Sequence, residues 1–219
     1  IREKTFCECT ALQEIRLPDG LELIGRSAFS ECEALQEIRL PDGLKEIGSD
    51  AFSGCRSLRQ ITVPVGVKCI ETAVFQSCRA LQEVHLPEGL EQIGMFAFED
   101  CDTLTRIVLP ASLKRLCRGA FENCTSLLEA QLPDGLEELQ DDAFEYCRSL
   151  QKVTIPAQVR QIERAAFYYC QSLQEVQLPE ELNEIGEDAF AHCWALKRIV
   201  IPAGVEKVGE HAFWECYSL

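Results

Sequence analysis

The chain has 219 residues and a formal net charge of −15, and 47% of its residues are hydrophobic. An acidic chain without a stripe of lysine and arginine is unsuited to binding nucleic acid, because phosphate groups require basic side chains. The sequence contains no run of about 20 apolar residues, so direct insertion into a membrane is not expected either.

A 23-residue unit repeats along the whole sequence without an insertion, with leucines at this interval from Leu12 to Leu219. A fixed period of about 20–30 residues with leucine at fixed offsets is typical of a leucine-rich-repeat solenoid. We expect a single solenoid domain over 1–219, with a partial coil over 1–11 and nine full repeats over 12–218. Because the repeat starts and stops in mid-unit, we also expect the chain to be a segment of a longer protein.

The first element of each repeat is a half-buried strand, represented by 12–18. Ile15 and Leu17 point to one side while Glu14 and Arg16 point to the other, which is the period of two of a strand. Stacked in register, these strands should form a parallel sheet on the concave side of the solenoid. A proline follows each strand and ends the ladder, because proline lacks an N–H donor.

A turn and a shorter strand come next. Glycine occupies the position of Gly20 in six of nine repeats, which predicts a special backbone angle there. The segment 21–25 is a short extended run on the opposite wall. The last segment, 28–32, reads Ala-Phe-x-x-Cys and predicts one helical or 3₁₀ turn with Phe29 and Cys32 inside. The expected fold class is thus an α/β leucine-rich-repeat solenoid dominated by β structure.

Ten of the thirteen cysteines occupy one position of the repeat, that of Cys32. On a stacked solenoid their β carbons should be about 4.8 Å apart, whereas a disulfide prefers about 3.8 Å. We therefore expect a ladder of buried, unpaired thiols that act as small apolar side chains. Cys7, Cys69 and Cys117 lie off this ladder. Because the repeat itself demands most of the cysteines, their number does not indicate a redox compartment.

The combined motif resembles the BspA-like (Treponema pallidum-type) leucine-rich repeats. The resemblance rests on Leu-x-x-Ile-x-Leu-Pro over 12–18, Leu-x-x-Ile-Gly over 21–25, Ala-Phe-x-x-Cys over 28–32 and their copies along 1–219. It implies a non-enzymatic module for protein–protein interaction and cell adhesion. It also implies an extracellular or cell-surface location, in a bacterium or a protist, with host or matrix proteins as partners. The resemblance implies no catalytic residues.

Two other functions stay open. The uncapped ends could contact further repeats or subunits end to end, which would make the chain a structural or scaffold segment, inside the cell in the case of a protist. An enzyme whose chemistry lies in an appended domain is the other. Within the chain we find no Gly-rich phosphate loop or Ser/His/Asp set, and His85, His192 and His211 lie far apart in register. We expect no catalysis, cofactor or metal.

The net charge does not fall on the expected concave sheet. Its outward positions hold seven basic and five acidic residues, a balance of +2. The excess acid falls on turns, at the two positions after each proline and at those of Ser27, Ser30 and Glu31. In the full repeats the latter three positions hold nine acids and no base. Solubility is one interpretation, and a cationic partner or weak divalent-ion binding is the other.

Two surfaces are candidate binding sites. On the concave sheet the outward side chains vary while the core positions do not, and the candidates are Arg16, Arg39, Arg59, His85, Arg106, Val108, Leu128, Lys152, Arg198 and Val200. Part of their charge alternation should be cross-strand pairing. Apart from phenylalanine, every aromatic residue lies in the last third, around Phe-x-x-Cys: Tyr146, Tyr168, Tyr169, Trp194, Trp214 and Tyr217. Tyrosine and tryptophan often anchor interfaces, and local packing is the alternative.

Overall fold

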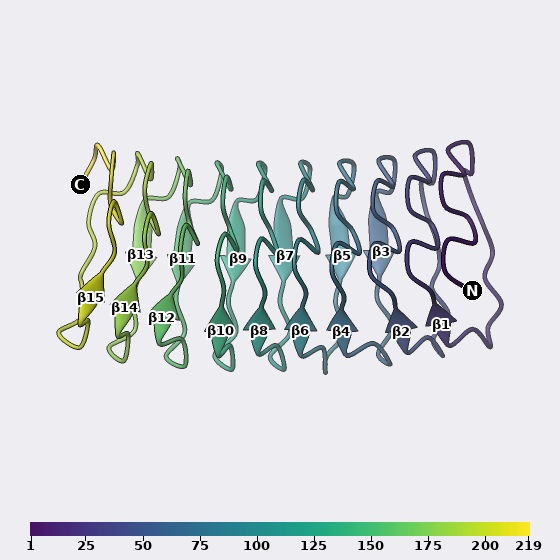
Figure 1. The fold of residues 1–219 in the computed structure, drawn as a ribbon, viewed down its shortest axis with the longest axis horizontal. Helices are drawn as coiled ribbons and strands as arrows, with labels where there is room; N and C mark the ends of the chain where they lie inside the picture. Colours follow the sequence, from purple (N-terminus) through teal and green to yellow (C-terminus); the bar gives the residue numbers. More distant parts are fainter.

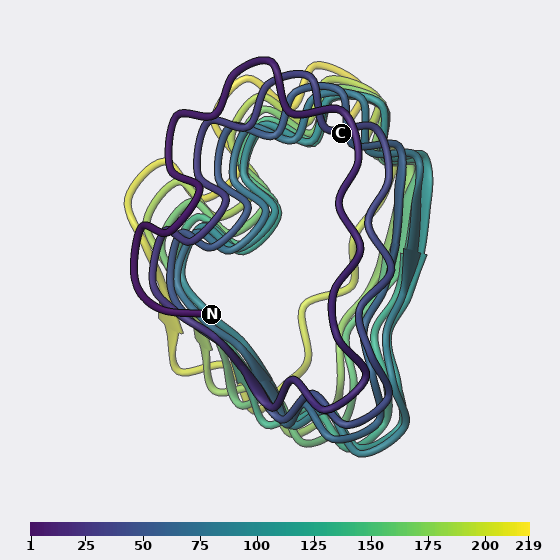
Figure 2. The ribbon, with the colours of Figure 1, turned by 90° about the vertical axis from the view of Figure 1, so that its right-hand side faces the viewer.

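The computed structural model describes all residues, 1–219, and shows a rod of stacked coils (Figure 1). Viewed along the rod, each coil has a long-strand side, a short-strand side and a bent turn segment that dips toward the interior (Figure 2). The structure contains fifteen short strands and no helix. The predicted solenoid of parallel β coils is therefore confirmed.

The long-strand side corresponds to the sheet that we expected to be concave. Its strands are β3 (Gln60–Thr62), β5 (Glu83–His85), β7 (Arg106–Val108), β9 (Glu129–Gln131), β11 (Lys152–Thr154) and β13 (Glu175–Gln177). Neighbouring strands pair in parallel, with Lys152 opposite Glu175, except that β5 and β7 are not paired. The predicted alternation is confirmed, since the central residue of each strand is buried and its neighbours are outside.

The strand predicted over 12–18 is absent. This stretch and 35–41 run past each other without forming a strand pair. One backbone bond joins them there, from the Gln36 N–H to the Gln13 oxygen at 3.3 Å. One bond is too few for a ladder, although Ile38 keeps the buried position that the pattern predicts.

The short-strand side confirms the second predicted strand. It consists of β1 (Leu23–Ile24), β2 (Glu46–Ile47), β4 (Cys69–Ile70), β6 (Gln92–Ile93), β8 (Arg115–Leu116), β10 (Glu138–Leu139), β12 (Gln161–Ile162), β14 (Glu184–Ile185) and β15 (Lys207–Val208). The second residue of each strand is buried in the core, apart from Val208 in β15. The strands pair in parallel, but not without interruption.

Glycine at the end of the short strand allows coils to stack closely. A β carbon on Gly48 would lie 2.7 Å from the Arg26 nitrogen, and one on Gly94 would lie 2.7 Å from the Ile70 oxygen. Both distances are far below a normal contact, so a side chain at this position requires the adjoining backbone to shift. Glycine is therefore favoured here by close packing and not by a positive φ angle.

The ladder opens where glutamate replaces this glycine. Glu71 follows β4 and Glu163 follows β12. Strands β2 and β4 are not paired, nor are β10 and β12, and neither glutamate N–H donates to the preceding coil. Figure 1 shows a wider gap at both places. Cys117 and Gln140 also replace the glycine, but they keep the rung at 2.9 and 3.0 Å, against 2.7 Å at Gly94.

The prediction of a helical or 3₁₀ turn over 28–32 is wrong. Every second N–H in this segment donates three residues back within its own coil, as Cys32 does to the Phe29 oxygen. The N–H groups between them donate to the next coil, as Phe29 does to the Ala51 oxygen at 2.8 Å. In a helix all these bonds would stay within the segment. The turn segments therefore form an inter-coil ladder of their own.

Left-handed residues produce this alternation. The positions of Ser27 and Glu31 have φ angles of 50° and 57° and keep a positive φ in every coil. Aspartate, asparagine and glycine tolerate this region best, and Asp142 is an example. The special angle expected at the glycine after proline is found only at Gly89, so that prediction is wrong for the other five glycines.

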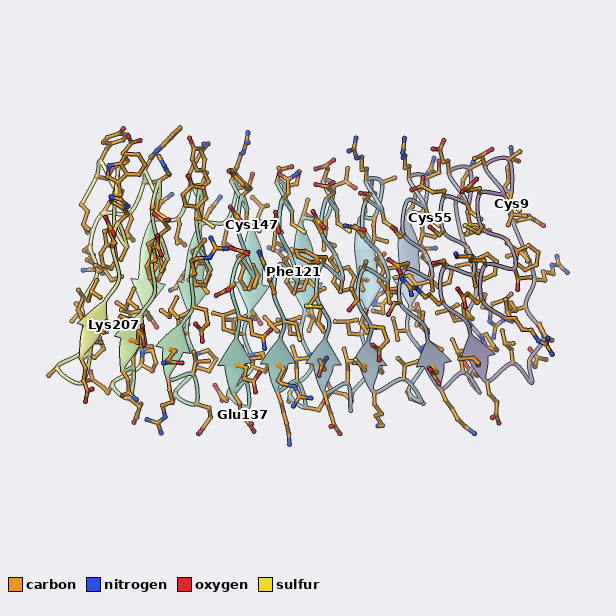
Figure 3. The ribbon with its side chains drawn as sticks, in the orientation of Figure 1. Cys9, Cys55, Phe121, Glu137, Cys147 and Lys207 are labelled. Atoms are coloured by element: carbon orange, nitrogen blue, oxygen red, sulfur yellow. The ribbon has the colours of Figure 1, made fainter.

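Two stacked columns fill the core. Phenylalanine rings run from Phe6 to Phe213, with neighbouring centroids 5.1 to 5.7 Å apart. Beside them the thiols from Cys32 to Cys193 are buried and unpaired. Each thiol donates to a phenylalanine carbonyl of the preceding coil, as Cys55 does to Phe29 at 3.2 Å. The predicted thiol ladder is confirmed, and exposed Cys9 lies at its N-terminal end (Figure 3).

Candidate functional site

The structure places all ten candidates of the long-strand side on the surface. Val108 and Val200 are 75% and 79% exposed, so they are apolar side chains that the core does not use. Leu128 is 41% exposed at the start of β9's coil. Exposure makes these residues available to a partner, but it does not by itself distinguish a binding surface from a solvated sheet.

Two shallow hollows lie on this side. The first, of about 640 Å³, is entirely polar and is lined by Gln13, Glu14, Gln36, Glu37, Arg59, Gln60, Gln82 and Glu83. The second, of about 500 Å³, is lined by Arg106, Leu128, Glu129, Ala130, Gln131, Leu132, Gln151, Lys152, Val153 and Thr154. Of the predicted residues, Arg59 lines the first hollow, and Arg106, Leu128 and Lys152 line the second. The glutamines were missed, although their recurrence at the position of Gln13 is visible in the sequence.

Charges on the long-strand side pair with one another, as the alternation predicts. Arg106 lies 3.9 Å from Glu129, and Lys152 lies 3.6 Å from Glu175 on the next strand. His85 lies 3.0 Å from Glu83. These contacts neutralise much of the charge of the C-terminal half of the sheet. Arg16, Arg39 and Arg59, by contrast, have no ion pair.

The six predicted aromatic residues form one connected surface, which we call the aromatic edge: Tyr146, Tyr168, Tyr169, Trp194, Trp214 and Tyr217. Its ring centroids are 5.2 to 6.5 Å apart along the chain of contacts from Tyr146 to Tyr217. His192, which sequence reasoning missed, joins Trp214 to the others, at 4.9 Å from Trp214 and 4.3 Å from Tyr169. Its position in the repeat is that of Tyr146 and Tyr169, which is the signal that could have found it.

Exposure increases along the aromatic edge toward its C-terminal end. The tyrosines at 146, 168 and 169 are half-buried. Trp194, Trp214 and Tyr217 are 38%, 51% and 72% exposed. Both interpretations of the edge therefore apply to different parts of it, because the inner rings pack locally while the outer rings face solvent.

His192 is the buried centre of this edge. Its Nδ1 lies 3.0 Å from a carboxylate oxygen of Glu215, yet it makes no hydrogen bond. The distance is short enough for a hydrogen bond, but the two groups are not aligned as a hydrogen bond requires. The imidazole is thus held by ring contacts, with Glu215 as an electrostatic neighbour.

Three carboxylates continue the aromatic edge toward the N-terminus, and we call Glu99, Glu122 and Glu145 the acid ladder. Burial together with neighbouring Glu99 raises the pKa of Glu122 to about 7. Burial together with Asp142 and Glu122 raises the pKa of Glu145 to about 7 as well. Gln76 donates to Glu99 at 2.5 Å.

The nearest arginines are held by a different acid. Asp142 is buried, and it accepts from Arg118 at 3.0 Å and from Arg164 at 2.9 Å. The side chains of Glu122 and Glu145 have no hydrogen bond or ion pair of their own. The ladder is therefore a row of carboxylates in which these two have no directly contacting cation, although the charge of Arg118 acts to lower the pKa of both.

Other site chemistry is sparse. No group of three or more His, Cys, Asp or Glu side chains is arranged to hold a metal ion. No helix of a length and hydropathy suited to crossing a membrane is found either. Burial raises the pKa of the Cys78 thiol to about 12, which keeps this ladder thiol protonated and unreactive.

Comparisons with known proteins agree with the fold. The family described as "BspA type Leucine rich repeat region (6 copies)" matches residues 1–127 and 91–219. A leucine-rich repeat protein from Bacteroides ovatus has a similar structure, with a TM-score of 0.87 and 28% identity over 94% of this chain and 62% of that one. The Treponema pallidum leucine-rich repeat protein shares 34% identity at a TM-score of 0.67, over 72% of each chain. No curated protein matches the sequence.

Proposed function

This chain belongs to the BspA-type leucine-rich repeat family, and from that premise we propose that it is a non-enzymatic, protein-binding module of a cell-surface or secreted protein that acts in adhesion. Members of leucine-rich repeat families generally serve as scaffolds for protein interaction. The stack of coils supports this role, because it presents extended surfaces to a partner. The chain spans 62% of the Bacteroides ovatus protein.

The aromatic edge carries the proposal. Trp194 and Tyr217 contact each other at 6.5 Å between ring centroids, Trp214 joins the edge through His192, and all three rings are exposed. Tryptophan and tyrosine are the residues most often found at the energetic centre of protein interfaces. Exposed rings in contact with one another therefore support binding of a protein partner at this edge.

A pull-down with a matched control tests the proposal. The variant Trp194→Ala with Trp214→Ala should lose partners that the unchanged chain captures from extracts of the source cell and of the cells it contacts. Val108→Ala with Val200→Ala removes exposed apolar groups from the long-strand side and should keep those partners. The melting temperatures of both variants should stay close to that of the unchanged chain.

Capture that survives in the tryptophan variant but fails in the valine variant would move the site to the long-strand side. Loss of stability in the tryptophan variant would support local packing instead. Surface location has its own test, since an antibody against this segment should label intact cells. Labelling only after permeabilisation, together with self-association of the chain in light scattering, would favour a structural segment inside the cell.

A further inference from the structure

We propose that the aromatic edge and the acid ladder form one binding surface for a segment of a partner protein that carries arginine and lysine side chains. The inference rests on the proposed protein-binding function and names the chemistry of the partner. It follows from the continuity of the two features, from the missing counter-charge of the ladder and from the affinity of exposed rings for cations.

The two features are continuous because they occupy the same repeat positions. Glu99, Glu122 and Glu145 are followed at their position by Tyr168 in the next coil. Tyr146 is the residue after Glu145 in the sequence, and the centroid of its ring lies 5.6 Å from that of Tyr168. Stacked coils advance by about 4.8 Å, so carboxylates and rings form one uninterrupted row. Figure 3 shows the side chains of this turn side along one edge, with the rings gathered at its C-terminal end.

The arginines nearest to the acid ladder form ion pairs with another residue. Arg118 and Arg164 direct their guanidinium groups to Asp142, at 3.0 and 2.9 Å, which leaves Glu122 and Glu145 without an ion pair. The raised pKa of both groups agrees with this geometry, because partial burial and then the neighbouring carboxylates disfavour their charged forms. A cationic side chain placed beside the ladder would relieve that repulsion.

The ring half of the surface also suits a cation. The guanidinium of Arg148 already lies 5.8 Å from the ring centre of Tyr146, so this edge accepts a cation over an aromatic face within its own chain. Trp194 and Trp214 expose further ring faces, and tryptophan attracts cations more strongly than the other aromatic residues do. Glu215 adds a carboxylate between these rings, 3.0 Å from His192.

Charge also selects among classes of partner. Phosphate groups of a nucleic acid or of an anionic lipid would be repelled by the ladder. A protein segment with arginine and lysine meets both halves at once, because its cations face carboxylates and its aliphatic stems cover rings. A second copy of this chain is the remaining source of arginine, and Arg16, Arg39 and Arg59 are among its unpaired cations.

Tryptophan fluorescence reports directly on this surface, because the chain has two tryptophans and both belong to the aromatic edge. A synthetic peptide of alternating arginine and serine should change the emission in a saturable way, and added salt should weaken its binding. A peptide of alternating glutamate and serine should cause no change. Equal binding of the two peptides would contradict the proposal.

Matched charge variants separate the ladder from net charge. Glu122→Gln with Glu145→Gln should weaken arginine-peptide binding about tenfold. Glu91→Gln with Glu137→Gln removes the same charge from exposed positions and should leave the dissociation constant unchanged. Glu137 lies at the opposite edge of the rod (Figure 3). An equal effect of the two pairs would overturn the assignment and leave only bulk electrostatic attraction.

Failure of this inference is distinguishable from failure of the proposed function. If the peptide does not bind but the tryptophan variant still loses its captured partners, the edge binds proteins of another chemistry. If the unchanged chain dimerises in analytical ultracentrifugation, and the ladder variant does not, the occupant is a second copy and the partner-protein assignment is wrong.

Discussion

The long-strand side and the aromatic edge are built on the same coils but treat charge in opposite ways. On the long-strand side acid and base alternate between neighbouring strands, so Lys152 reaches Glu175 at 3.6 Å. In the acid ladder the same position holds glutamate in three successive coils, and Glu122 stays unpaired between its neighbours. An in-register stack places each residue beside its equivalent in the next coil. Where acidic and basic residues alternate between coils, their charges pair within the chain. Where the same acidic residue recurs, its charge stays available to a partner.

The largest expected effect removes the support that both surfaces share. Phe121 stacks between Phe98 and Phe144 at 5.3 and 5.4 Å. Phe121→Ala should lower the free energy of unfolding by about 3–5 kcal/mol, because it leaves a cavity in the column. Urea denaturation followed by circular dichroism measures this loss. A change no larger than that of Val108→Ala on the surface would show that the column does not carry the stack.

A smaller effect is expected at the buried charge beneath the acid ladder. Asp142→Asn keeps the left-handed backbone but loses the charge that holds Arg118 and Arg164. We expect a loss of about 1.5–3 kcal/mol, the range for hydrogen bonds to charged groups. The pKa values of Glu122 and Glu145 should fall, because one like charge disappears and two arginines are freed, as NMR titration would show. Asp188→Asn, at the same repeat position, is the control and should leave both pKa values unchanged.

The stability of the chain should depend on pH because Glu122 and Glu145 of the acid ladder titrate. The pKa of Glu122 and Glu145 is raised in the folded chain from 4.5 to about 7, so the folded state binds more protons than the unfolded state between these values. Stability contributed by these groups is therefore present at low pH and is lost as the pH rises from 4.5 to about 7. As the pH rises through this window, the free energy of unfolding of the variant Glu122→Gln with Glu145→Gln should increase relative to that of the unchanged chain, as urea denaturation at several pH values would show. A gain that shrinks with rising pH would contradict the assignment.

The smallest effect is expected on the long-strand side. The side chains of Lys152 and Glu175 are 56% and 39% exposed, so water screens their pairing and it is worth about 0.2–1 kcal/mol. A double-mutant cycle with Lys152→Gln and Glu175→Gln measures the coupling, which should decrease in high salt. Coupling as strong as that of Asp142 with its arginines would remove the contrast between the two surfaces.

The sequence predicted correctly those contacts that a side chain makes with the residue at the same repeat position of the next coil. The phenylalanine and cysteine columns and the cross-strand pairing of Lys152 follow from the period alone. The turn over 28–32 did not, since its hydrogen bonds depend on left-handed residues at the positions of Ser27 and Glu31. Aspartate, asparagine and glycine recur there, but glutamate, tyrosine and histidine also occur, which hides the backbone requirement.

The candidate sites were predicted in part. The aromatic edge was foreseen as a set, whereas His192 was not, because a single histidine in an acidic chain carries no signal until its neighbours are known. The acid ladder was visible only as an excess of charge on turns. Whether Glu122 is paired depends on where Arg118 points, and no sequence pattern specifies that its guanidinium selects Asp142 instead.

The glutamates that interrupt the short-strand ladder determine where neighbouring coils are joined by the fewest hydrogen bonds on that side. At Glu71 and Glu163 the short-strand side carries no rungs, while the turn side stays bonded through Asp50 N–H to the Thr72 oxygen at 2.9 Å and Asp142 N–H to the Arg164 oxygen at 3.0 Å. At both junctions the coils are bonded on the turn side but not on the short-strand side, and β9 and β11 also stay paired across the second. We therefore expect neighbouring coils to separate first on the short-strand side. The second junction crosses the aromatic edge between Tyr146 and Tyr168, so the spacing of these rings depends on the bonds that remain there.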